Sequence, residues 1–225
     1  MFLRVYFTDV TPLTEDAVFE EYYREAIPER RTKVDAFKLK MPKCRSLAAG
    51  ALLKKALSDA GLSGTDYHIE TTETGKPILK GAGASSVFFN LSHSGERAMC
   101  VISDCPVGCD VETVKEKTRN VADRYFTESE AKLVAENSEI FTRLWTLKES
   151  FVKTTGEGLA RPLDSFSFDF DETDAIRGVE GDGIEPGTYS FYEWNFNDGY
   201  WYAACVQGQG LTPEVEWVDL SSVQG

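Results

Sequence analysis

Eight short segments of the chain, rich in apolar, β-branched and aromatic residues, have the pattern of β-strands. They cover residues 2–8, 68–71, 87–90, 98–102, 107–112, 165–170, 189–194 and 200–206. Three longer segments, 43–60, 128–137 and 139–155, repeat their apolar residues every three to four positions, which predicts helices. This mixture of strands and helices indicates an α+β fold.

Local signals set the limits of two of these helices. Thr127 followed by Glu130 predicts a capping box at the start of the helix over 128–137. Gly156 and Gly158 end the helix over 139–155, so Glu149 and Lys153 fall in its last turns.

Composition excludes several classes of protein. The 225 residues, 42% of them hydrophobic, are enough to bury a core, and no apolar run approaches the roughly 20 residues of a membrane-spanning helix. We therefore expect no membrane partner and a cytoplasmic location. Five cysteines without a Cys-x-x-Cys pair, beside only two histidines, predict neither a zinc site nor a disulfide framework, and Cys109 is interpreted as a buried filler residue.

Charge is distributed unevenly. The net charge of -13 argues against nucleic-acid binding, yet residues 24–45 contain eight basic residues against three acids. This basic stretch suits an anionic ligand and suits equally a solvated helical face.

Two segments carry the candidate chemistry. Asp110 and Glu112 stand two apart in a strand, so their carboxylates share one face, and Trp145, Glu149 and Lys153 share one face of a helix. Together they would hold a hard divalent cation against a phosphate. Taken separately, the first pair fits an exposed strand end and the second an ordinary ion pair four residues apart.

Two further segments could receive phosphate. Ser92, His93 and Ser94 follow an apolar strand, where a turn would offer backbone N–H groups, hydroxyls and an imidazole, although a lone histidine is often structural. Arg45 and Ser46 lie near the start of the helix after Pro42, where a guanidinium and helix N–H groups can bind phosphate jointly.

Four motifs together resemble the Sfp-type 4'-phosphopantetheinyl transferases. The family carries Gly-Lys-Pro, Asn-hydrophobic-Ser-His-Ser, Gly-hydrophobic-Asp-hydrophobic-Glu and Trp-Ser/Thr-x-Lys-Glu-Ser/Ala-x-x-Lys in this order. The matching segments are residues 75–77, 90–94, 108–112 and 145–153, within a resemblance that runs from about residue 28 to 167.

The resemblance implies a fold and an activity. The fold is two similar α+β lobes related by a pseudo-twofold, with the ligand cleft between them; we expect lobes of residues 1–105 and 106–225 and a monomer. The activity is Mg²⁺-dependent transfer of the 4'-phosphopantetheine arm of coenzyme A to a serine of an acyl, peptidyl or polyketide carrier protein, with release of adenosine 3',5'-bisphosphate. The carrier and the pathway are not specified by these motifs.

The same resemblance implies roles for individual residues. Asp110, Glu112 and Glu149 would hold Mg²⁺, with Lys148 and Lys153 near the diphosphate, and Glu149 and Lys153 are the candidate catalytic residues. The remaining candidates would bind coenzyme A: Ser92 and His93 at its phosphates, Lys76 beside the adenine, and Arg30, Lys33, Arg45 and Ser46 at the 3'-phosphate. Arg30 stands where a lysine is common in the family and Ser46 where a threonine is common.

Three hypotheses remain open at this point. The acceptor serine's proton would go to Glu149, directly or through a metal-bound water. An acidic carrier would dock on Lys115, Lys117, Arg119 and Arg124, unless these residues only form a solvated loop. The alternative functions are a metal-dependent pyrophosphohydrolase of coenzyme A or a nucleotide, and a catalytically silent coenzyme A-binding protein.

Overall fold

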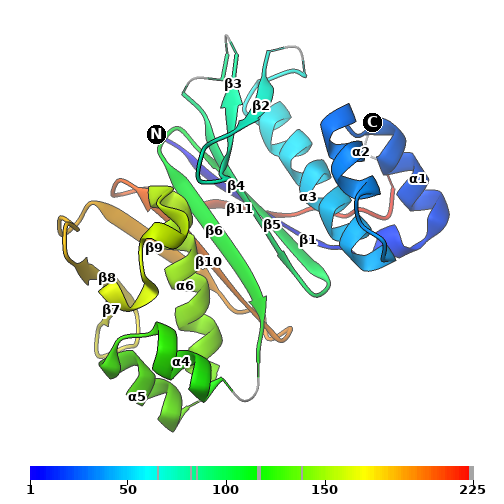
Figure 1. The fold of residues 1–225 in the computed structure, drawn as a ribbon. Helices are drawn as coiled ribbons and strands as arrows, with labels where there is room; N and C mark the ends of the chain where they lie inside the picture. Colours follow the sequence, from blue (N-terminus) through cyan, green and yellow to red (C-terminus); the bar gives the residue numbers. More distant parts are fainter. Residues whose placement is uncertain (65, 82, 85, 116–117, 138, 223–225) are drawn as a thin grey trace.

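The computed structural model describes residues 1–64, 66–81, 83–84, 86–115, 118–137 and 139–222 (Figure 1). Its fold is α+β, as predicted. In chain order the helices and strands are β1 (Leu3–Asp9), α1 (Asp16–Glu25), α2 (Pro28–Asp35), α3 (Lys40–Asp59), β2 (His68–Thr71), β3 (Pro77–Lys80), β4 (Phe88–Ser94), β5 (Arg97–Ser103), β6 (Val107–Thr113), α4 (Arg119–Tyr125), α5 (Glu128–Glu136), α6 (Glu139–Thr155), β7 (Phe166–Phe170), β8 (Ile176–Gly181), β9 (Tyr189–Trp194), β10 (Tyr200–Gln207) and β11 (Glu214–Trp217).

The first lobe is a four-stranded sheet covered by helices. Its strand order is β11-β1-β5-β4, and α3 packs against β1, β4 and β5 with α1 and α2 outside it (Figure 1). Because side chains alternate along a strand, Cys100 and Ile102 of β5 face α3. They form one core with the buried face of α3, which includes Leu47, Leu52 and Leu57.

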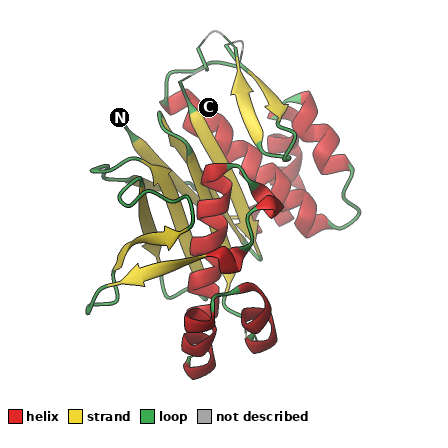
Figure 2. Cartoon of the chain, turned by 60° about the vertical axis from the view of Figure 1, so that its left-hand side comes forward, coloured by secondary structure: helices red, strands yellow, loops and turns green. Residues whose placement is uncertain are grey.

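The second lobe repeats this plan. Its sheet has the order β6-β10-β9, and α6 packs against β6 and β10. Helices α4 and α5 lie together at one end of α6 (Figures 1 and 2). The predicted capping box begins α5, where Thr127 Oγ1 accepts from the Glu130 N–H and the Glu130 side chain accepts from the Thr127 N–H. Two lobes of the same plan agree with the predicted pseudo-twofold arrangement.

A third core lies where the two sheets face each other. Leu3, Val5 and Phe7 of β1 point into it, and Val107, Cys109 and Val111 come from β6. Cys109 is thus buried between the sheets, as predicted for a filler residue, and burial raises the pKa of its thiol to about 12.

A row of side chains joins the neighbouring edges of the two lobes. The backbone N–H groups of Cys109, Val111 and Thr113 in β6 donate to the Asn90, Ser92 and Ser94 side chains of β4, over 3.0, 3.3 and 3.4 Å. The two-residue spacing of donors and acceptors follows from the period of a strand. We call this row the polar seam; it fixes β4 in register with β6.

The strand and helix predictions were largely confirmed, and their errors concern length and omissions. Residues 92–94 continue β4 and do not form the predicted turn. Helix α3 begins at Lys40, so Arg45 lies in its second turn and its N–H is not a free N-terminal group. Helices α1, α2 and α4 and strands β3, β8 and β11 were not predicted.

One strand does not follow the predicted lobe boundary between residues 105 and 106. Strand β11 pairs in parallel with β1, from Arg4 with Glu214 to Phe7 with Trp217. Strand β11, from the second half of the sequence, therefore completes the sheet of the first lobe. Of the described helices, not one combines the length and apolar character required to span a bilayer.

Candidate functional site

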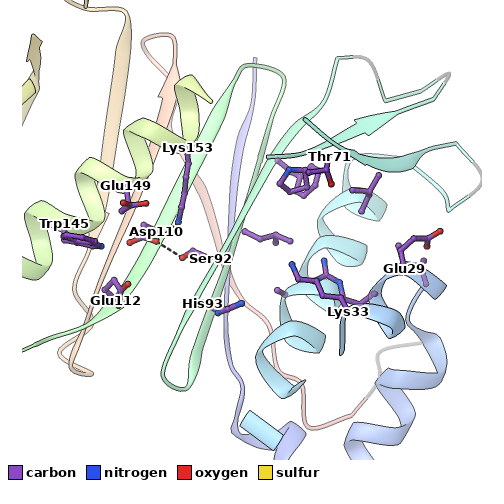
Figure 3. Close-up of a pocket in the computed structure, with 17 residues that line it drawn as sticks. Glu29, Lys33, Thr71, Ser92, His93, Asp110, Glu112, Trp145, Glu149 and Lys153 are labelled. Atoms are coloured by element: carbon purple, nitrogen blue, oxygen red, sulfur yellow. Dashed lines mark hydrogen bonds and ion pairs between the residues drawn. The ribbon is translucent and has the colours of Figure 1, made fainter. Parts of the chain in front are cut away.

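A cleft of about 770 Å³ lies between the lobes (Figure 3). Acidic side chains of β6 and α6 line one side, and basic side chains of α2 line the other, with β4 between them. Eight of the twelve predicted site residues line it: Arg30, Lys33, Ser92, His93, Asp110, Glu112, Glu149 and Lys153.

Asp110 is the most enclosed carboxylate of the cleft. Its Oδ1 accepts from Lys153 Nζ at 2.6 Å and from Ser92 Oγ at 2.8 Å. Its Oδ2 is buried and has no hydrogen-bond partner in the described part of the chain. Burial raises the pKa of Asp110, while the charge of Lys153 opposes that rise. A buried carboxylate oxygen without a partner indicates that a ligand completes its surroundings.

Glu112 and Glu149 stand beside Asp110. Glu112 follows on the same face of β6 and accepts from Ser94 Oγ at 2.9 Å. Burial raises the pKa of Glu149, and the charges of Asp110 and Glu112 raise it further. The three carboxylates therefore form one anionic group, whose mutual repulsion a cation would relieve.

Gly108 permits the close approach of α6 to β6. A Cβ at this position would lie 2.3 Å from the Ser150 carbonyl oxygen and 2.5 Å from the Thr154 nitrogen. Any side chain would push the helix away and separate Glu149 and Lys153 from Asp110. The glycine of the motif thus has a packing role.

Lys153 is the cation of the acidic side. Burial alone would lower its pKa, but the Asp110 carboxylate and the other anions nearby outweigh burial and hold the pKa above its usual value. Its Nζ also donates to the Cys109 carbonyl oxygen at 3.2 Å. The ammonium group is therefore held charged at the edge of the cleft.

The donor set fits Mg²⁺ in kind, since all its ligands are carboxylate oxygens. Magnesium in phosphate sites typically takes one or two carboxylates, with waters and substrate oxygens completing its shell. Within the described ranges, no three His, Cys, Asp or Glu side chains form a preassembled metal cluster. Asp110, Glu112 and Glu149 offer carboxylate oxygens of the kind that magnesium takes beside a phosphate.

The opposite side of the cleft collects positive charge. Arg30 Nη1 donates to the Ser46 carbonyl oxygen at 3.2 Å, and burial lowers the pKa of Arg30 and of Lys33. His93 also has a lowered pKa, first because the surrounding protein partly desolvates the ring and then because Arg45, Lys33 and Lys153 repel a proton. Arg45 Nε is buried without a hydrogen-bond partner among the described residues. Such a cluster is arranged to receive an anion.

Four predicted binding residues lie outside the cleft lining. Lys148 is fully buried: its Nζ pairs with Glu130 at 2.8 Å and donates to the carbonyl oxygens of Leu163 and Phe166, so its predicted place near the diphosphate is wrong. Ser46 is buried and its carbonyl oxygen accepts from Arg30, Arg45 is close enough to His93 for its charge to lower the pKa of that ring, and Lys76 extends to the end of α6.

Sequence reasoning missed the polar seam. Asn90 was quoted only as part of a motif. Ser92 and Ser94 were offered as phosphate ligands, whereas their hydroxyls donate to Asp110 and Glu112 and accept from β6. The alternation of Asn90, Ser92 and Ser94 with larger residues was the available signal, since it places all three on one face of β4.

Comparison with known proteins connects this cleft to one family. Residues 106–205 match the family model described as the 4'-phosphopantetheinyl transferase superfamily. The chain is 33% identical over 202 residues to 4'-phosphopantetheinyl transferase Sfp of Bacillus subtilis (strain 168), covering 87% of this chain and 88% of that protein. It is also 33% identical over 174 residues to 4'-phosphopantetheinyl transferase gsp of Aneurinibacillus migulanus, covering 75% of this chain and 70% of that protein.

Proposed function

Since the chain belongs to the 4'-phosphopantetheinyl transferases, we propose that it transfers the 4'-phosphopantetheine arm of coenzyme A to a serine of a carrier protein. Adenosine 3',5'-bisphosphate is the second product. The observation that carries the proposal is the cleft itself, which has carboxylates and a lysine on one side and a basic cluster on the other. Coenzyme A has a matching form, with a diphosphate in its middle and a separate 3'-phosphate.

The basic cluster would bind the 3'-phosphate. Arg30 and Lys33 line the cleft, and Arg45, whose charge acts on His93, has a buried Nε without a hydrogen-bond partner among the described residues. A phosphate dianion there would offset the desolvation of these cations, which at present lowers the pKa of Arg30 and Lys33. This contact orients the nucleotide so that the diphosphate reaches the acidic side.

The acidic side would hold Mg²⁺ between Asp110, Glu112 and Glu149. The metal, when bound with the diphosphate, supplies positive charge against the charge that develops on the phosphate oxygens. Lys153 Nζ adds a fixed ammonium group on the same side. Ser92 and Ser94 hold the first two carboxylates in place through hydrogen bonds of 2.8 and 2.9 Å.

Glu149 is the proposed acceptor of the proton from the attacking serine. It lines the cleft, and it is not one of the residues of the polar seam. Burial and two neighbouring carboxylates raise the pKa of Glu149, which makes it a stronger base.

The test is the Glu149→Gln variant, measured by mass spectrometry of an apo carrier protein with coenzyme A and Mg²⁺. We expect transfer to fall by about 10³-fold or more while coenzyme A still binds by calorimetry. Glu139→Gln, an exposed position at the start of the same helix, is the matched control and should transfer normally.

The same assay separates the alternative functions. Breakdown of coenzyme A by the wild-type protein without any carrier would identify a pyrophosphohydrolase. Binding of coenzyme A with no modification of any carrier would identify a silent binding protein. If Glu149→Gln transferred at the wild-type rate, the general base would be another residue.

The proposal extends to location and assembly. We propose a cytoplasmic monomer, because both sides of the cleft come from one chain and no second copy is needed to complete it. The carrier would dock beside the acidic side, near Arg119 and Arg124, which are exposed on α4. Lys115 pairs with Glu112 at 3.1 Å, and Lys117 lies outside the described residues.

A further inference from the structure

Lys76 connects the first lobe to the end of α6. Its Nζ donates to the carbonyl oxygen of Lys153 at 2.5 Å and to that of Val107 at 3.3 Å, with the Thr154 carbonyl oxygen at 3.4 Å. The side chain is thus directed at the second lobe, where it contacts the last turn of one helix and the first residue of β6.

The turn that carries Lys76 is well defined. Thr72 N–H donates to the Lys76 carbonyl oxygen at 2.9 Å, and the Lys76 N–H donates to Thr72 Oγ1 at 3.0 Å. Gly75 has a φ of 86°, a conformation that suits glycine, and Pro77 begins β3. The Gly-Lys-Pro motif therefore builds a rigid turn that presents the Lys76 side chain in one direction.

The acceptors of Lys76 are carbonyl groups that helix geometry leaves free. The last four carbonyls of a helix have no partner within the helix, and the helix dipole makes that end negative. Lys153 and Thr154 are two of these four in α6. A lysine from the other lobe thus satisfies the end of α6, and burial lowers its pKa there.

Lys153 is therefore held at both ends. Its carbonyl oxygen accepts from Lys76, and its Nζ donates to Asp110 at 2.6 Å. A change in the last turn of α6 would shift this ammonium group relative to Asp110. The turn of β2 and β3 belongs to the cleft as well, since Thr71 and Pro77 line it.

We propose that Lys76 is a positioning residue for the transfer reaction: by binding the last carbonyls of α6 it sets the place of Lys153, and it couples that place to ligand contacts on the β2–β3 hairpin. This inference rests on the proposed function. It assigns Lys76 to the alignment of the reacting groups and not to direct contact with the nucleotide.

The experiment compares Lys76→Met, Lys76→Gln and Lys76→Arg with a control, Lys80→Met, which changes an exposed lysine at the end of β3. Steady-state transfer is measured at varied coenzyme A. We expect Lys76→Met to lower kcat about tenfold with the KM for coenzyme A changed by less than about twofold. Lys76→Arg should restore most of kcat, Lys76→Gln should be intermediate, and Lys80→Met should match the wild type.

Hydrogen exchange provides a readout independent of activity. The amides at the end of α6, near residues 153–156, should exchange faster in Lys76→Met than in Lys80→Met or the wild type. If the wild type transfers nothing, the proposed function fails, while hydrogen exchange still tests whether Lys76 stabilises the end of α6. If Lys76→Met does not fold, the kcat of Lys76→Gln decides.

Three results would overturn the inference. One is a raised KM for coenzyme A at unchanged kcat, which would make Lys76 a nucleotide-binding residue. The second is wild-type kcat in both Lys76→Met and Lys76→Gln. The third is unchanged exchange at the end of α6 in Lys76→Met.

Discussion

Two lysines of one motif, Lys148 and Lys153, have opposite surroundings in this protein. Lys153 pairs with Asp110 at the cleft, whereas Lys148 pairs with Glu130 in the interior with its side chain fully buried. At 100° per residue, positions five apart on a helix differ by about 140° in direction. One residue type in one motif therefore serves the site in one case and the packing of α5 on α6 in the other.

The surroundings of each pair explain the difference. Glu130 belongs to the capping box of α5 and also accepts from the Phe168 N–H at 3.4 Å, so Lys148 is joined to a structural network. Asp110 keeps one oxygen without a partner among the described residues, and that oxygen remains for a ligand. The pair of Lys148 and Glu130 therefore has its partners within the fold, whereas the pair of Lys153 and Asp110 leaves one carboxylate oxygen for a ligand.

The largest effect should come from Lys153→Met. The variant removes the ammonium group that faces the diphosphate, and we expect kcat/KM for transfer to fall by about 10³-fold. The measurement is the mass-spectrometric transfer assay.

The control is the double variant Lys153→Met/Asp110→Asn, which removes both charges of the pair. We expect it to regain stability relative to Lys153→Met but not to regain transfer. If it regained transfer, the pair would have a structural role and would not differ from the pair of Lys148 and Glu130.

Lys148→Met should act on stability and leave binding of coenzyme A intact. Removing one partner of a buried ion pair typically costs about 3–5 kcal/mol, because the other charge stays buried. Urea denaturation followed by circular dichroism measures the loss. In the double variant Lys148→Met/Glu130→Leu, much of the lost unfolding free energy should return. If Lys148→Met instead left the unfolding free energy unchanged and raised the KM for coenzyme A, Lys148 would be a ligand-binding residue.

A smaller effect is expected where α4 meets the carrier. In Arg119→Glu/Arg124→Glu, repulsion of an acidic carrier should raise the KM for the carrier about tenfold and leave the KM for coenzyme A unchanged. Lys54→Glu/Lys80→Glu, with the same charge change at exposed positions of the first lobe, is the control. If both double variants raised the KM for the carrier equally, the cause would be net charge and not a local docking surface on α4.

The smallest effect concerns His93 and pH. Its pKa is lowered in the folded state, so the unfolded chain takes up a proton first as the pH falls through the ordinary histidine value of about 6.5. Folding stability should therefore fall on acidification below that pH, and His93→Gln should lose this component, as followed by urea midpoints.

Motif spacing predicted the acidic side of the site well. Trp145, Glu149 and Lys153 were placed on one helix face by their four-residue spacing, and all three line the cleft. Lys148 was assigned by family resemblance without regard to its direction on the helix. Periodicity alone would have placed it about 100° from Glu149 and about 140° from Lys153.

Elements with few buried residues could not be predicted from the sequence. Helix α2 buries only Val34, so it has no apolar repeat, and α3 hides Ser46 where a pattern search expects an apolar residue. All four residues of β11 are exposed, and its partner β1 lies at the other end of the chain. Such elements depend on tertiary contacts that no local pattern records.

The pairing of β11 with β1 has a consequence for the order of folding during synthesis. Strand β1 is synthesised before residues 10–213 and β11 after them, so this edge of the sheet stays unpaired while those residues emerge from the ribosome. An open strand edge is a template for pairing with other chains. A nascent chain stalled or cut before residue 214 would therefore expose the unpaired edge of β1, which β11 covers in the folded protein.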